Sequence, residues 1–120
     1  MRAAMAEMVS ALSFLPGVAA AMIVGADDGL IVEASAPRSG TAAAADQRRH
    51  TAALAAYLYG KVGRASNMAR LGIPAFMRLE AEGGQVCIVG SRELVLVTIL
   101  DRDANLGRVR LDMMQAAQSR

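Results

Sequence analysis

Few side chains in this sequence could do chemistry, and none is spaced so as to assemble a reactive site. Cys87 is the only cysteine and His50 the only histidine, so neither has the neighbours that a metal site or a nucleophile–base pair requires. Cys87 lies in an apolar run, where we expect a small buried side chain rather than a reactive thiol. We expect His50 to be an exposed polar residue near the start of a helix.

Two further patterns resemble chemistry but lack its context. Glu80 and Glu82 share one side of an expected strand, yet an exposed strand does not desolvate a carboxyl group enough to raise its pKa. The run Gly60-Lys61-Val62-Gly63 echoes a phosphate-binding lysine, but it lies inside a helical pattern without a preceding strand and glycine-rich loop. We therefore expect no catalytic residue, no metal and no cofactor, and a function carried by surfaces.

Composition restricts the class of protein. With 120 residues and 54% apolar content, we expect a single domain over 1–120 with one hydrophobic core. A net charge of +2 with two Tyr, two Phe and no Trp offers neither a stacking platform nor a basic stripe, which argues against nucleic acid. The lone cysteine favours a reducing cytoplasm. Pro16-Gly17 interrupts the uncharged stretch between Glu7 and Asp27, which argues against membrane insertion, and Glu7 argues against a signal peptide.

The elements that must position any surface are predicted from periodicity. The longest is an alanine-rich helix from Thr41 to Arg70, with Ser39 or Thr41 as its N-cap and with Leu71-Gly72-Ile73-Pro74 ending it. Apolar spacing of three and four predicts a helix over 2–15 and another after a cap in Asp101-Arg102-Asp103. The expected strands are Val18–Ala26, Leu30–Ala34, Ala75–Glu82, Gln85–Val89 and Leu94–Leu100, with Asp27-Asp28-Gly29 turning the first hairpin.

Strand parity predicts how these elements are arranged. Two strands, Val18–Val24 and Leu94–Leu100, are apolar at both odd and even positions, so both of their faces are expected to be buried at the centre of the sheet. The expected edge strands are Leu30–Ser35 and Arg78–Glu82. The prediction is an α+β, αββαβββα three-layer sandwich with an antiparallel sheet in the order 2-1-5-4-3. The long helix covers one face and the two terminal helices cover the other. We expect Leu54 and Leu58 to pack on the sheet, and another side of that helix to meet a second copy.

The charged edge strand has two interpretations. Alternating charges can simply protect an edge from aggregation. Alternatively, two copies pair antiparallel, with Arg78 facing Glu82 across a two-fold axis and the long helices packing beside them. The predicted homodimer interface consists of Leu54, Tyr57, Leu58, Lys61 and Arg64 on the helix and Phe76, Arg78, Glu80 and Glu82 on the strand.

The two ends of this pattern resemble a known family. Leu12 and Leu15–Val24, followed by Asp28–Val32, are similar to the opening of the roadblock, or dynein light-chain roadblock-type, family. Leu94–Asp101 followed by Asn105–Arg110 is similar to its closing strand and helix. The resemblance covers nearly the whole chain, and its motifs are structural. It implies a domain that dimerises through its second helix and third strand.

The resemblance also implies a class of partner. Bacterial and archaeal roadblock proteins are partners of small Ras-like GTPases, including a gliding-motility system in which a roadblock dimer activates the GTPase by reshaping its switch regions without donating a catalytic arginine. Eukaryotic relatives are scaffold subunits. We therefore expect a cytoplasmic, non-enzymatic homodimer that binds a small Ras-like GTPase, with stimulation of hydrolysis left open. The alternatives are a dimerisation scaffold with a non-GTPase partner and a small-molecule sensor.

Overall fold

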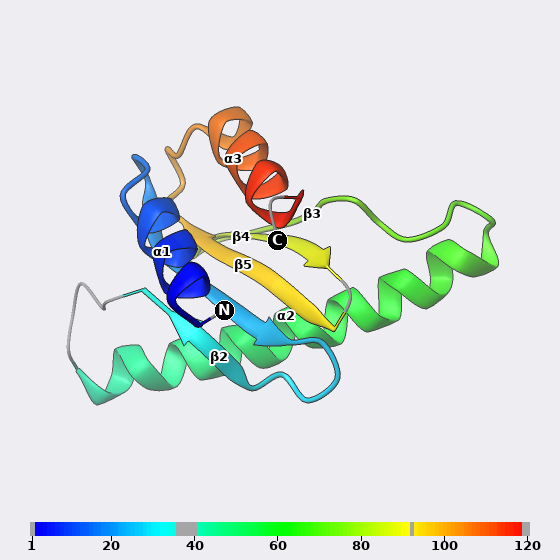
Figure 1. Ribbon diagram of the computed structural model, residues 1–120, viewed down its shortest axis with the longest axis horizontal. Coiled ribbons are helices and arrows are strands. Elements are labelled where there is room, and N and C mark those ends of the chain that lie inside the picture. The colour runs from blue at the N-terminus through cyan, green and yellow to red at the C-terminus, as the bar shows by residue number, and fades with distance from the viewer. Residues whose placement is uncertain (1, 36–40, 92, 119–120) are drawn as a thin grey trace.

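The computed structural model describes residues 2–35, 41–91 and 93–118, and its elements follow the predicted order (Figure 1). They are α1 (Arg2–Ser13), β1 (Val18–Gly25), β2 (Ile31–Ala34), α2 (Ala42–Met68), β3 (Met77–Ala81), β4 (Gly84–Ser91), β5 (Leu94–Leu100) and α3 (Leu106–Gln118). Each expected helix and strand is present; β5 has the expected bounds, and the ends of the other elements differ from the prediction by a few residues. Residues 36–40, which include the N-cap candidate Ser39, and Arg92 lie outside the described residues.

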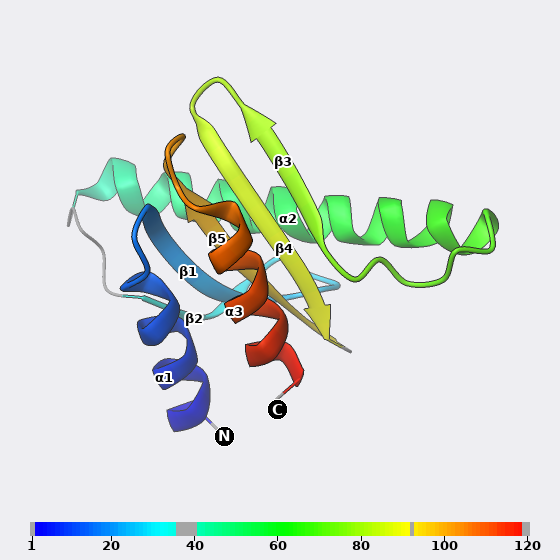
Figure 2. The ribbon, with the colours of Figure 1, turned by 90° about the horizontal axis from the view of Figure 1, so that it is seen from above.

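The sheet confirms the order predicted from parity. Its five strands run β2-β1-β5-β4-β3, and every neighbouring pair is antiparallel. The inner strands β1 and β5 are buried along most of their length. Helix α2 crosses one face of the sheet, while α1 and α3 lie side by side on the other, which gives the three layers (Figures 1 and 2).

Each face of the sheet has its own apolar core. Under α1 and α3 lie mainly larger side chains: Val9, Leu12, Val109 and Met113 from the helices against Ile23, Cys87, Val89 and Leu96 from the strands. Under α2 the helix contributes three buried alanines, Ala52, Ala55 and Ala56, which pack against Met22, Val24, Ile88, Val95 and Val97. Alanines let the axis of α2 lie close to the sheet, because they add little side-chain volume between the two layers.

This alanine face corrects one sequence prediction. Leu54, expected on the sheet, is 41% exposed, whereas Leu58 does pack against the α2 core as a half-buried residue. The prediction for Leu54 was wrong because α2 carries small apolar residues on several sides, so its leucines did not mark the buried row.

Both ends of α2 have identifiable caps. Thr41 Oγ1 accepts a hydrogen bond from Ala44 N at 3.1 Å, as expected of an N-cap. The helix ends at Met68 rather than Arg70, and Leu71 N donates to Ser66 O at 2.9 Å. Arg70 N donates to Asn67 O at 3.0 Å, and Arg70 has a φ of 63°. This is a Schellman motif in which Arg70 takes the left-handed position directly after the C-cap. Gly72, the glycine expected to end the helix, also has a positive φ, of 82°, but lies two residues further on.

We expect Arg70→Gly to stabilise the protein by about 0.5–1 kcal/mol, because glycine adopts positive φ without the steric cost that a Cβ brings, although it loses more backbone entropy on folding. Urea unfolding measures the change. Arg70→Ala removes the same charge but keeps the Cβ, and should gain nothing. Equal stabilities for the two variants would contradict the prediction.

The remaining turns position the sheet and the last helix. In the β1–β2 hairpin, Gly25 N donates to Leu30 O at 2.9 Å and Gly29 has a φ of 71°, which confirms the predicted turn. Helix α3 begins later than its expected cap: Asn105 Oδ1, rather than a side chain of the 101–103 run, accepts from Arg108 N at 3.2 Å. Within the described ranges, no helix combines the length and apolarity needed to cross a membrane.

Candidate interaction surface

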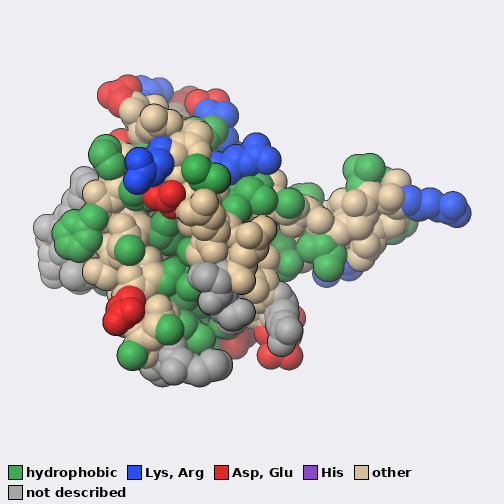
Figure 3. Space-filling model, turned by 45° about the horizontal axis from the view of Figure 1, so that its top comes forward, with side chains coloured by type: hydrophobic (Ala, Val, Ile, Leu, Met, Phe, Trp, Pro, Cys, Tyr) green, Lys and Arg blue, Asp and Glu red, His purple; other side chains and the backbone are tan. Residues whose placement is uncertain are grey.

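The C-terminal part of α2 projects beyond the sheet. All its fully buried residues lie at or before Ala56, and Leu58 and Tyr59 are the last that pack against the α2 core. Residues 60–73, which we name the α2 arm, extend past the edge of the body in the ribbon and space-filling views (Figures 1 and 3). The arm is therefore a surface held out from the rest of the molecule.

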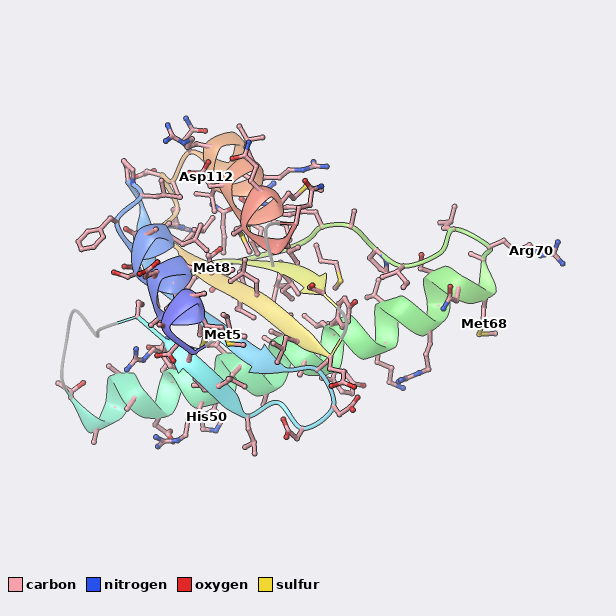
Figure 4. The ribbon with its side chains drawn as sticks, in the orientation of Figure 1. Met5, Met8, His50, Met68, Arg70 and Asp112 are labelled. Atoms are coloured by element: carbon pink, nitrogen blue, oxygen red, sulfur yellow. The ribbon has the colours of Figure 1, made fainter. Side chains whose placement is uncertain are left out.

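The α2 arm combines exposed apolar and basic side chains. Met68 is 87% exposed, Leu71 79% and Ile73 71%, and Figure 4 shows Met68 and Arg70 at the tip, pointing away from the sheet. Lys61, Arg64 and Arg70 are exposed, and the sequence has no Asp or Glu from 47 to 79. Several exposed apolar side chains on one projecting segment are typical of a binding surface, and the basic residues among them favour a partner that carries both apolar side chains and carboxylates.

The predicted interface residues on α2 are mostly accessible. Leu54, Tyr57, Lys61 and Arg64 are exposed, and Leu58 is half-buried against its own sheet. Lys61 Nζ lies 5.8 Å from the centroid of the Tyr57 ring, close enough for a weak cation–π contact at an exposed site. The structure thus places four of the five where a second chain could reach them, and their part in a dimer stays a prediction.

On the edge strand the predicted residues have different surroundings. Phe76 packs against the core under α1 and α3, and the Arg110 guanidinium lies 5.0 Å from its ring centroid. Arg78 Nη2 lies 2.9 Å from Glu80 Oε2, and Arg78 Nε donates to Gln85 Oε1 at 2.8 Å.

Because Phe76 packs on the core and contacts Arg110, it is largely held within its own subunit. Arg78 and Glu80 instead form a charged pair at the sheet edge. Glu82 is exposed in the turn that follows β3.

A second surface, a groove, lies on the opposite face of the sheet and was not foreseen from the sequence. A groove of about 670 Å³ runs between α1 and α3 and is lined by Ala4, Glu7, Met8, Ala11, Leu12, Asp112, Gln115 and Ala116. Figure 4 places Met8 and Asp112 on the two helices that border it. The Asp112 carboxylate lies 3.2 Å from Arg108 Nε. The apolar stripes of both helices indicated the core beneath them but not the gap between them.

The two residues with the most reactive side chains have the expected environments. Cys87 is fully buried, and this burial raises the pKa of its thiol despite the lowering effects of the Thr98 side-chain hydrogen bond and the Arg78 charge. His50 is exposed, and its Nδ1 lies 2.9 Å from Asp46 O. Across the residues that the structure describes, no group of three or more His, Cys, Asp or Glu side chains could hold a metal ion.

Sequence comparison finds the same family along most of the chain. The model of a family described as the Roadblock/LC7 domain matches residues 5–101. An uncharacterized protein from Methanocaldococcus jannaschii is 30% identical over 101 residues, which are 84% of this chain and 82% of that protein.

Solved structures share the fold. The Roadblock/LC7 domain from Streptomyces avermitilis superposes with a TM-score of 0.79 at 20% identity, covering 95% of this chain and 92% of that one. MglB from Myxococcus xanthus gives a TM-score of 0.79 at 17% identity, with 95% and 89% covered. At these identities the structural likeness establishes the arrangement of helices and strands.

Proposed function

The chain belongs to the Roadblock/LC7 family, and from this premise we propose that it is a cytoplasmic, self-pairing regulator that binds a small Ras-like GTPase. The family resemblance noted from the sequence supports this class of partner. In this proposal the protein contributes binding surfaces and no catalytic side chain, and the GTPase brings its own nucleotide and active site. The pairing places two α2 helices, one from each subunit, on the same side of the dimer.

The observation that carries the proposal is the α2 arm. Its apolar side chains are exposed instead of packing into the subunit's own core. Its lysine and arginine side chains have no Asp or Glu beside them in the sequence between residues 47 and 79. The last turn of α2 and the residues that follow it can present the exposed apolar side chains together to an apolar groove of a partner. The switch loops of a GTPase change their order and position with the nucleotide, so they offer a surface that differs between states.

Regulation then follows from differential affinity. A binding protein can shift the switch loops only to the extent that it binds one of their arrangements more tightly than the other. We propose that the arm prefers the GTP-bound arrangement. Acceleration of hydrolysis would require a further preference for the transition-state arrangement.

The test uses a small Ras-like GTPase from the organism that encodes this chain. We expect it to bind at least about tenfold more tightly when loaded with a non-hydrolysable GTP analogue than with GDP, a difference of about 1.4 kcal/mol, measured by titration calorimetry. Leu71→Asp on the α2 arm should weaken the complex. Leu111→Asp should not, because Leu111 is an equally apolar residue that is 55% exposed on α3, on the other face.

Three results would count against the proposal. If the GTPase bound in neither nucleotide state, the proposed function would be wrong. If it bound equally in both, the chain would be a scaffold rather than a regulator. If Leu111→Asp weakened binding and Leu71→Asp did not, the partner would occupy the face that carries α1 and α3.

A further inference from the structure

The outer edge of β3 is an unpaired strand edge that could bind another strand. β3 ends the sheet, and within the described residues no strand pairs with its outer side (Figure 2). Its five residues, Met77–Ala81, pair with β4 from Met77↔Ile88 to Ala81↔Gly84 without a register shift. An edge with regular pairing on one side presents regularly spaced backbone groups on the other, and can accept another strand.

Side chains of β3 alternate between the two layers. Arg78 and Glu80 stand opposite Cys87 and Gln85 on β4, so they lie on the face covered by α1 and α3, to whose core Cys87 belongs. Met77 packs instead against the α2 core, as does Val86, the cross-strand partner of Leu79. Arg78 and Glu80 therefore form one charged row and Met77, Leu79 and Ala81 form one apolar row.

The charged row is held in place from within the subunit. Arg78 Nε donates to Gln85 Oε1 at 2.8 Å, and Gln85 Nε2 donates in turn to the carbonyl oxygens of Asp101 and Arg102 at 3.4 Å. Because Gln85 is buried, its hydrogen bond holds the guanidinium group of Arg78 in position at the sheet edge. The Arg78 side chain is 37% exposed and that of Glu80 67%, which leaves both able to contact a neighbouring strand.

Antiparallel pairing of two identical strands about a two-fold axis permits only certain registers. Centred on Leu79, all five residues of β3 pair: Met77 with Ala81, Arg78 with Glu80, and Leu79 with its own copy. Centred on Glu80, Arg78 would face Glu82, which lies outside the strand, and Glu80 would face its own copy. Like charges directly opposite one another destabilise a strand pair, and opposite charges stabilise it.

Resting on the self-pairing in the proposed function, we propose that Arg78 and Glu80 form a self-recognition element. It centres the β3–β3 pairing on Leu79, in place of the Arg78–Glu82 pairing expected from the sequence, and selects a second copy of this chain as the partner. The pair between Arg78 of one copy and Glu80 of the other then occurs twice in the dimer, once on each side of the axis. A strand with two like charges at these positions is rejected.

Charge exchange tests the element directly. Arg78→Glu places two acidic strands together and Glu80→Arg places two basic ones together, so each variant alone should dissociate at least about tenfold more readily than the unaltered chain. Mixed in equal amounts, the two variants should form a heterodimer with affinity restored, as measured by analytical ultracentrifugation. Repulsion within each strand persists in the mixture, so recovery reports contact between subunits. Glu82→Arg is the matched control and should pair normally.

A second measurement reads the register. In a Cys87→Ala background, Leu79→Cys should form a disulfide between subunits under mild oxidation, because the two thiols lie opposite each other at the axis. Glu80→Cys should cross-link more slowly. Circular dichroism confirms that each variant is folded before it is compared.

The outcomes separate this inference from the proposed function. A dimer that cross-links faster through Glu80→Cys, or a variant mixture that fails to recover, would overturn the self-recognition element while leaving the dimer intact. A wild-type chain that stays monomeric at high concentration would overturn the self-pairing itself, and the charges of β3 would then only protect an edge.

Discussion

Gly17→Ala is expected to destabilise the protein by about 2–5 kcal/mol, the sum of a strained backbone and a steric overlap. Gly17 has a φ of 84°. A Cβ built there would stand 2.5 Å from Ala104 Cβ and 2.6 Å from Ala104 Cα, distances that require backbone to move. Gly17 O also accepts a hydrogen bond from Asp101 N at 2.8 Å, so the movement would loosen the junction between β5 and α3.

Urea unfolding followed by circular dichroism measures this loss. Gly63→Ala is a control of opposite sign, because Gly63 lies in α2 and a Cβ there meets nothing within 4 Å. That variant should gain up to about 1 kcal/mol, since alanine is the better helix former. If Gly17→Ala unfolded at the same urea concentration as the unaltered chain, the close approach to Ala104 would not exist in solution.

Ala55→Leu should cost about 1–3 kcal/mol through overpacking. Ala55 is fully buried between α2 and the strands, and three added carbons have no space unless the helix lifts from the sheet. Because the same helix carries Leu54, Tyr57 and Leu58 of the predicted dimer interface, we also expect self-association to weaken. Chemical unfolding and sedimentation measure the two effects on one sample.

Ala43→Leu is the matched control for the Ala55 variant. Ala43 is exposed in the first turn of the same helix, and its substitution should change stability by no more than about 0.5 kcal/mol. Equal losses at the two positions would mean that α2 does not pack on the sheet through its alanines.

The sheet could be predicted from the sequence because its strands differ in kind. β1 and β5 are apolar on both parities, which is possible only where both faces are covered, and this placed them at the centre. Residues 78–82 carry charges on one parity, which placed β3 at an edge. Hairpin signals then left few ways to connect the remaining strands.

The orientation of α2 could not be predicted in the same way. Ala52, Ala55 and Ala56 form the buried row, while Leu54 is exposed, so hydrophobicity and burial do not rank these residues alike. A helix lined with small apolar residues has no single stripe that dominates. How closely it can approach the sheet is a property of the assembled layers, and that distance decides which row is buried.

The residues that begin and end the helices could be predicted only in part. Both Asp101 and Asp103 are good capping types, yet Asn105 caps α3, because several acceptors lie in a row and only the geometry of the chain reversal selects one. Both Arg70 and Gly72 are left-handed after α2, yet it is Arg70 that closes the Schellman motif. The interface residues on α2 and β3 remain predictions, since a single subunit does not report what its neighbour contacts.

The two edge strands of the sheet, β2 and β3, differ in how well they can pair with a further strand, and this difference limits the size of any assembly. β2 is only four residues long, and its pairing with β1 shifts register between Ile23 and Val24. A short, irregular edge is a poor template for another strand. Strand addition would therefore stop after a single event at β3, and the product would be a closed particle instead of a growing fibre.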